Sequence, residues 1–111
     1  FSIVDNSQKT KLNLKRNNYE KYFDFDKIQK EIIIRTRKDG DKIIPLGMTG
    51  SKKLKDIFIN MKIPKEERDI IPIVCFDNKI SWIVGLRVSD EYKVTSDTKK
   101  ILIMNVKRKE Y

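Results

Sequence analysis

The chain has 111 residues, which suits one domain with a core large enough to need no disulfide or metal. Its 25 Lys and Arg outnumber its 16 Asp and Glu, and the formal net charge of +9 favours a polyanionic partner such as nucleic acid. No apolar run reaches membrane-spanning length, and histidine, the commonest general base and zinc ligand, is absent. We therefore expect no membrane association, no metal site and no catalytic residue in this chain.

The start of the chain suggests a larger parent protein. Phe1 rather than Met is the first residue, and residues 1–14 lack the charged-then-apolar layout of a secretion signal. We expect a cytoplasmic fragment of a longer protein. Within it, residues 1–22 are predicted to form an N-terminal strand and linker region that leads into a domain at residues 23–111.

The first predicted elements are strands. Apolar and polar residues alternate at Lys11–Lys15 and at Tyr22–Asp26, which favours two half-buried strands joined by a loop. The β-branched run Glu31–Arg37 predicts a further strand, and its Arg35 and Arg37 side chains share one face. A Gly-containing turn then ends this strand.

Residues 51–62 carry the clearest helical pattern in the chain. One apolar stripe at helical spacing is formed by Leu54, Ile57, Phe58 and Met61. Ser51 is the expected N-cap of this helix. Pro64 predicts the first turn of a second, short helix through Lys65–Arg68.

The second half of the chain is again extended. The runs Pro72–Phe76 and Ile80–Val84, separated by the turn Asp77–Lys79, predict a β-hairpin, and Lys100–Val106 predicts a last strand. Cys75, the only cysteine, lies inside an apolar run and is expected to be a buried, inert thiol. Because strands dominate, we predict an α+β fold, mostly an antiparallel sheet or sandwich with one or two short central helices.

Trp82 has two interpretations. An exposed Trp stacks on bases in proteins that bind single-stranded RNA. Alternation along the predicted strand, however, places Trp82 on the same apolar face as Ile80 and Val84. We therefore expect Trp82 to pack in the core.

Positive charge is concentrated in the middle of the chain. Residues 35–68 hold ten Lys or Arg against five Asp or Glu, whereas residues 69–97 hold three against five. Such a segregated basic stretch meets the requirements of phosphate binding, and the alternative is a solvated surface face. Arg35 has two equally plausible partners, a phosphate of a ligand and the carboxylate of Asp41 in the same chain. The planar guanidinium suits either oxyanion.

The segment Gly47–Lys53 has the features of an anion site. The glycines allow close approach, the lysines neutralise charge, and the N–H groups of the predicted helix start point outward unpaired. A nucleotide-binding P-loop needs Gly-Lys followed by Ser or Thr, whereas the order here is Gly50-Ser51-Lys52-Lys53. The segment therefore suits a phosphate oxygen, and its residue order disfavours ATP binding.

An ordered series of motifs is spread over about residues 23–103, which is most of the chain. The series consists of Ile34–Asp41, Gly47–Asp56, Lys62–Pro64 with Arg68 and Pro72, and Trp82–Arg87. Together these motifs resemble the C-terminal domain of tRNA(Ile) lysidine synthetase. The resemblance implies a fold similar to a domain in the β chain of phenylalanyl-tRNA synthetase.

The resemblance also implies the chemistry of a parent ligase. Such an enzyme uses ATP, with magnesium, to activate the wobble cytidine of tRNA(Ile), and then joins lysine to it to form lysidine. The Ser-Gly-Gly-x-Asp-Ser pyrophosphate loop of its N-terminal catalytic domain does not occur in this sequence. We expect this chain to be non-catalytic and to hold no cofactor. Its expected partners are tRNA(Ile) and its own N-terminal catalytic domain, and a homodimer is left open.

In this family the C-terminal domain is expected to hold the tRNA toward its acceptor stem, mainly through phosphates and riboses, because A-form RNA hides its base edges in a deep groove. The resemblance and the charge pattern together give ten expected nucleic-acid contacts: Arg35, Arg37, Gly50, Ser51, Lys52, Lys53, Lys55, Lys62, Arg68 and Arg87. The alternative is a structural, interdomain or dimerisation module without direct RNA contact, whose basic face only keeps it soluble.

Overall fold

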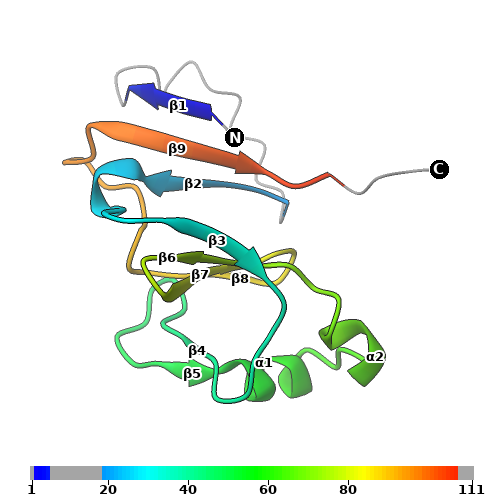
Figure 1. The fold of residues 1–111 in the computed structure, drawn as a ribbon. Coiled ribbons are helices and arrows are strands. Elements are labelled where there is room, and N and C mark those ends of the chain that lie inside the picture. Colours follow the sequence, from blue (N-terminus) through cyan, green and yellow to red (C-terminus); the bar gives the residue numbers. More distant parts are fainter. Residues whose placement is uncertain (1, 6–18, 108–111) are drawn as a thin grey trace.

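Two antiparallel sheets and a third layer of short elements are stacked in the computed structural model, which describes residues 2–5 and 19–107 (Figure 1). The first sheet has the order β1-β9-β2 and consists of β1 (Ser2–Asp5), β9 (Lys100–Asn105) and β2 (Glu20–Asp24). The second has the order β3-β6-β7-β8 and consists of β3 (Ile32–Arg35), β6 (Ile73–Phe76), β7 (Lys79–Ile83) and β8 (Arg87–Val88). The α+β prediction with antiparallel sheets is thus confirmed.

The third layer lies below the second sheet in Figure 1 and carries the two helices. It consists of β4 (Lys42–Ile43), β5 (Lys52–Lys53), α1 (Leu54–Asn60) and α2 (Lys65–Arg68). The predicted second helix after Pro64 is confirmed. The first helix is shorter than the predicted span 51–62, because the chain is still extended at β5.

Both faces of β6 are covered, which explains its unbroken apolar run. Val74 and Phe76 pack in a core between the two sheets, whereas Ile73 and Cys75 pack in a core toward α1. The inter-sheet core contains Phe23, Val74, Phe76, Trp82, Val84, Tyr92, Leu102 and Met104. The core under α1 contains Ile43, Leu54, Ile57, Phe58, Ile73, Cys75, Ile80 and Ile83.

The β6–β7 hairpin is confirmed, and its turn has the geometry that the sequence favours. Asp77 and Asn78 both have positive φ, 53° and 69°, as the two central residues of a type I′ turn require. The carboxylate of Asp77 also accepts backbone N–H groups of Gln29, Lys30 and Glu31 at 2.8, 2.6 and 3.0 Å. These bonds lower the pKa of Asp77 and fix the segment that connects the two sheets.

A β-bulge in β7 changes one predicted face. Val74 pairs with Trp82 but Cys75 pairs with Ile80, so Ser81 is an extra residue on β7. Trp82 is fully buried, which confirms its core role, and Val84 shares its core. Ile80 does not, because the bulge turns its side chain to the core under α1. The expectation of one shared face for all three residues was wrong for Ile80.

Other strand boundaries follow from local contacts. β2 ends at Asp24 rather than Asp26, because the Asp24 carboxylate accepts the N–H of Asp26 at 3.2 Å and begins a single 3-10 turn at Phe25–Lys27. β9 confirms the predicted last strand. The predicted strand at residues 11–15 lies outside the described residues.

Candidate nucleic-acid interface

The segment before α1 is extended, not helical. Lys42 pairs with Lys53 and Ile43 pairs with Lys52 in the β4–β5 ladder. The N–H of Leu54, the first residue of α1, is donated to the carbonyl of Asp41 at 3.0 Å. Lys53 is the N-cap residue and makes no side-chain capping bond, so the prediction of Ser51 as N-cap was wrong. Pairing with β4 outweighs the local helical pattern here.

A basic groove lies where the β3–β4 turn, the start of α1 and α2 meet. It has a volume of about 570 Å³, and we call it the Arg37 groove. Its cationic lining residues are Arg37, Lys38, Lys53, Lys55, Lys65 and Arg68. Its acidic lining residues are Asp39, Asp41 and Asp69, so cations outnumber carboxylates two to one. The concave shape and the excess of positive charge suit a polyanion.

The two arginines of the Arg37 groove both pack on one buried aromatic ring. Their guanidinium carbons lie over the ring of the buried Phe58, with Arg37 at 5.7 Å and Arg68 at 6.0 Å from the ring centroid. Arg37 also pairs with Asp69 at 2.8 Å, and Arg68 donates from Nε to the carbonyl of Ile63 at 2.8 Å. Both side chains are therefore oriented without a ligand.

Arg35 forms an ion pair with Asp41 of the same chain. Its two terminal nitrogens donate to the two carboxylate oxygens of Asp41 at 2.9 and 3.0 Å, and the N–H of Lys38 donates to the same carboxylate at 2.7 Å. Burial raises the pKa of Asp41, but the hydrogen bonds from Arg35 and Lys38 outweigh burial and leave the pKa below its ordinary value. Of the two partners that the sequence left open for Arg35, the structure shows Asp41.

We predict that Asp41→Asn lowers the free energy of unfolding at neutral pH by about 2 kcal/mol, since the charge-assisted bidentate pair with Arg35 is broken. Because the pKa of Asp41 is lowered in the folded protein, its contribution is complete above the ordinary Asp pKa of about 3.9. The contribution disappears as the pH falls through the lowered folded-state value. Urea unfolding of both proteins across this pH range is the measurement. An equal stability difference at neutral and strongly acidic pH would contradict the assignment.

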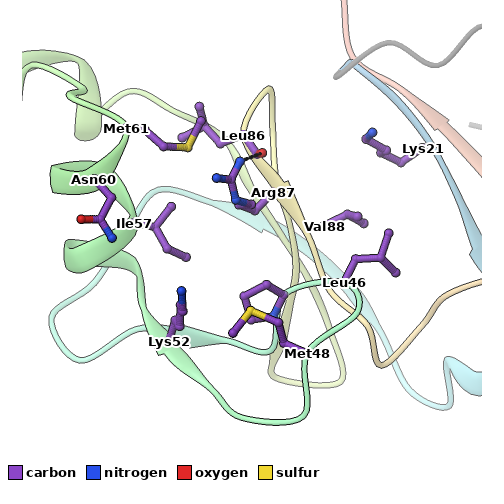
Figure 2. A pocket seen from close by; sticks show the side chains of 11 residues that line it. Lys21, Leu46, Met48, Lys52, Ile57, Asn60, Met61, Leu86, Arg87 and Val88 are labelled. Carbon is purple, nitrogen blue, oxygen red and sulfur yellow. Dashed lines mark hydrogen bonds between the residues drawn. The ribbon is translucent and has the colours of Figure 1, made fainter.

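A second groove, the Arg87 groove, lies between β2, β8 and α1 and has a volume of about 390 Å³ (Figure 2). Its lining is apolar, apart from Lys21, Lys52, Asn60 and Arg87. Arg87 donates to the carbonyl of Leu86 at 2.9 Å, and its guanidinium lies between Met61 and Met48 in Figure 2. No carboxylate among the described residues lines this groove.

The structure divides the expected contact residues between these grooves. Arg37, Lys53, Lys55 and Arg68 line the Arg37 groove, whereas Lys52 and Arg87 line the Arg87 groove. Lys52 and Lys53 separate because successive side chains of a strand point to opposite faces. The other four expected residues line neither groove: Arg35, Gly50, Ser51 and Lys62.

Sequence reasoning missed several groove residues. Lys38 and Lys65 line the Arg37 groove, and Lys21 lines the Arg87 groove. Lys38 and Lys65 lay within the basic stretch and were available from charge alone, but Lys21 comes from the other sheet and had no local signal.

Within residues 2–5 and 19–107, no group of three or more Cys, Asp or Glu side chains could hold a metal ion. Over the same ranges, no helix is long and apolar enough to cross a membrane. Cys75 is a free cysteine and is buried, which confirms the predicted burial, and burial raises the pKa of its thiol.

Comparison with known proteins identifies the family. The model of the TilS substrate C-terminal domain matches residues 32–104, which include both helices and every strand of the second sheet. The chain belongs to this family. A crystal structure of a TilS C-terminal domain has a TM-score of 0.71 and 34% identity, covering 84% of this chain and 73% of that one.

Curated relatives of this TilS domain are tRNA(Ile)-lysidine synthases. The protein from Clostridium perfringens is 61% identical over 86% of this chain and 20% of its own length, and that from Clostridium acetobutylicum is 48% identical over 97% and 23%. The chain therefore spans about a fifth of the length of these relatives.

The fold of the TilS domain is shared more widely. An N-terminal fragment of the phenylalanyl-tRNA synthetase β-subunit from Pyrococcus horikoshii has a TM-score of 0.63 at 23% identity, covering 76% of this chain and 26% of that one. The fold that the motif resemblance implied is thereby confirmed.

Proposed function

We propose that this chain is the tRNA-docking C-terminal domain of an ATP-dependent tRNA(Ile)-lysidine synthetase. The observation that carries the proposal is the Arg37 groove, in which six Lys and Arg side chains from three separate segments converge. Two of its arginines are already oriented on Phe58. A preorganised basic groove of this kind fits the phosphates and 2′-hydroxyls of an A-form acceptor stem.

The chemistry of ligation belongs, in this proposal, to the catalytic part of the parent enzyme in the cytoplasm. That part would bind ATP with magnesium and activate the wobble cytidine. The chain described here would contribute binding and orientation, because holding the tRNA at a distance from the anticodon reduces the entropic cost of presenting the wobble base. Its partners would be tRNA(Ile) and its own N-terminal catalytic domain.

The proposed contacts differ in how well the geometry supports them. Arg37, Lys53, Lys55 and Arg68 share one groove and carry most of the proposal. Arg35 is occupied by Asp41, which argues for a structural role. Predicted contacts that lie outside both grooves are Gly50, Ser51 and Lys62.

Footprinting of tRNA(Ile) with the complete enzyme, and with an enzyme that lacks this chain, tests the proposal. We expect backbone protection of the acceptor stem only with the complete enzyme, and protection of the anticodon loop with both. Charge reversal in the complete enzyme, Lys55→Glu with Arg68→Glu, should reproduce the loss at the acceptor stem. Acceptor-stem protection that survives both changes would contradict the docking role.

An interdomain role has one specific observation in its favour. β3 is an edge strand of the second sheet, and its Ile33 and Ile34 are exposed, with Ile34 60% accessible. An apolar edge strand of this kind suits docking of another part of the same enzyme. Cross-linking from β3 to the catalytic part, without cross-links from the Arg37 groove to RNA, would favour this role over tRNA docking.

A further inference from the structure

The Arg87 groove is lined by apolar side chains, which binding of an RNA backbone alone does not require. Leu46 and Met48 are exposed, at 55% and 38%, yet they lie in the loop between β4 and β5 that forms one wall of the groove. Leu86 and Met61 line the groove from other segments. Exposed apolar side chains that gather around a concave site indicate a ligand with an apolar face.

The loop that carries these side chains is fixed. Its backbone donates from Leu46 to the carbonyl of Val88 and from Met48 to the carbonyl of Pro45, both at 3.0 Å. Gly47 has a φ of 82°, as the third residue of a type II turn requires, and its N–H donates to the Asp90 carboxylate at 3.0 Å. The apolar wall is therefore in place before any ligand arrives.

The cations of the groove form no ion pair among the described residues. Lys21, Lys52 and Arg87 have no carboxylate within ion-pair distance among the described residues, whereas Arg37 in the other groove already pairs with Asp69. Figure 2 shows Lys21 at one end of the groove and Lys52 near the helix, with Arg87 between them. The site thus combines an apolar wall with unneutralised positive charge.

We propose that the Arg87 groove binds an unpaired nucleotide of RNA, an inference that rests on the proposed RNA-docking function. The base would lie against Met48 and Met61, whose thioethers contact aromatic rings favourably, and against the guanidinium plane of Arg87. The amide of Asn60 offers a donor and an acceptor to the edge of the base. Lys52 and Lys21 would neutralise the flanking phosphates.

The two grooves then bind different parts of the RNA. The Arg37 groove lacks such an apolar wall, since Leu54 is its one aliphatic lining residue among the described residues, and it suits paired backbone. The Arg87 groove suits a single-stranded end or a base that has left the stack.

The test compares two RNA hairpins bound to the full 111-residue chain, one with an unpaired 3′ extension and one with a blunt end. We expect the extended hairpin to bind about five- to hundredfold more tightly, the gain from stacking one base. A 2-aminopurine in the extension should brighten on binding, because the base leaves its RNA neighbours. Leu46→Ala with Met48→Ala should remove the advantage but leave the blunt hairpin's affinity unchanged.

Ile34→Ala is the matched control, because Ile34 is also an exposed aliphatic residue and lines neither groove. Equal binding of the two hairpins, or an advantage that survives in the double variant, overturns the inference and leaves backbone docking intact. Failure of both hairpins to bind contradicts the proposed function itself. If the double variant changes no RNA affinity but weakens attachment of this chain to the rest of its enzyme, the groove binds protein and the inference is wrong.

Discussion

Phe58→Ala should lower the free energy of unfolding by about 3–5 kcal/mol, a large part of the roughly 5–15 kcal/mol that holds a domain of this size folded. Phe58 is fully buried and lies in the core between α1 and the second sheet. With seven residues, α1 is too short to persist without tertiary contacts. Removal of the ring leaves a cavity and also removes the surface beneath the guanidinium groups of Arg37 and Arg68.

Thermal and urea unfolding, followed by circular dichroism and by the fluorescence of the single, buried Trp82, measure this loss. Ile59→Ala is the matched control, because Ile59 is the next residue of α1 but is 52% exposed. The control should change stability by less than about 1 kcal/mol. Similar losses in the two variants would mean that α1 does not depend on Phe58.

Lys53→Ala with Lys55→Ala should weaken tRNA binding about a hundredfold at low salt, if each lysine makes one charge-assisted hydrogen bond to a phosphate. Both residues line the Arg37 groove and have no ion-pair partner among the described residues. The slope of log affinity against log salt should fall by about 0.7–0.9 for each phosphate that the variant no longer neutralises. Titrations of tRNA with the complete enzyme at several salt concentrations give both quantities.

Lys99→Ala with Lys100→Ala is the control for this experiment. It removes the same formal charge at exposed positions beside and in β9, and neither residue lines the Arg37 groove or the Arg87 groove. The control should keep the full salt slope, whereas an equal effect would reduce the Arg37 groove to a general effect of net charge. A pair made from Lys52 and Lys53 is less informative, because these two neighbours line different grooves.

The parts of the fold that local sequence determines were predictable. The β6–β7 hairpin follows from two apolar runs around an Asp-Asn turn whose residues accept positive φ. Its bulge at Ser81 was not predictable, because nothing in the alternation of residues 80–84 marks the extra residue. The short helix after Pro64 was predictable from the fixed φ of proline.

The sequence predicted which stretch of the candidate site is basic but not how its side chains are arranged, because that geometry depends on contacts between distant segments. Charge alone pointed to the basic stretch, but the β4–β5 pairing that separates Lys52 from Lys53 has no local signature. Arg37 meets Asp69 across 32 positions of the chain. Arg35 meets Asp41 across six positions, and here the sequence named the partner without deciding between it and a phosphate.

The central position of β9 in the first sheet affects how the domain forms during synthesis. All four strands of the second sheet, from β3 to β8, leave the ribosome before β9, so that sheet is able to assemble first. β1 and β2 pair only with β9 among the described strands and must wait for it. Until then, Phe76 and Trp82 on the nascent second sheet lack the cover of Leu102 and Met104.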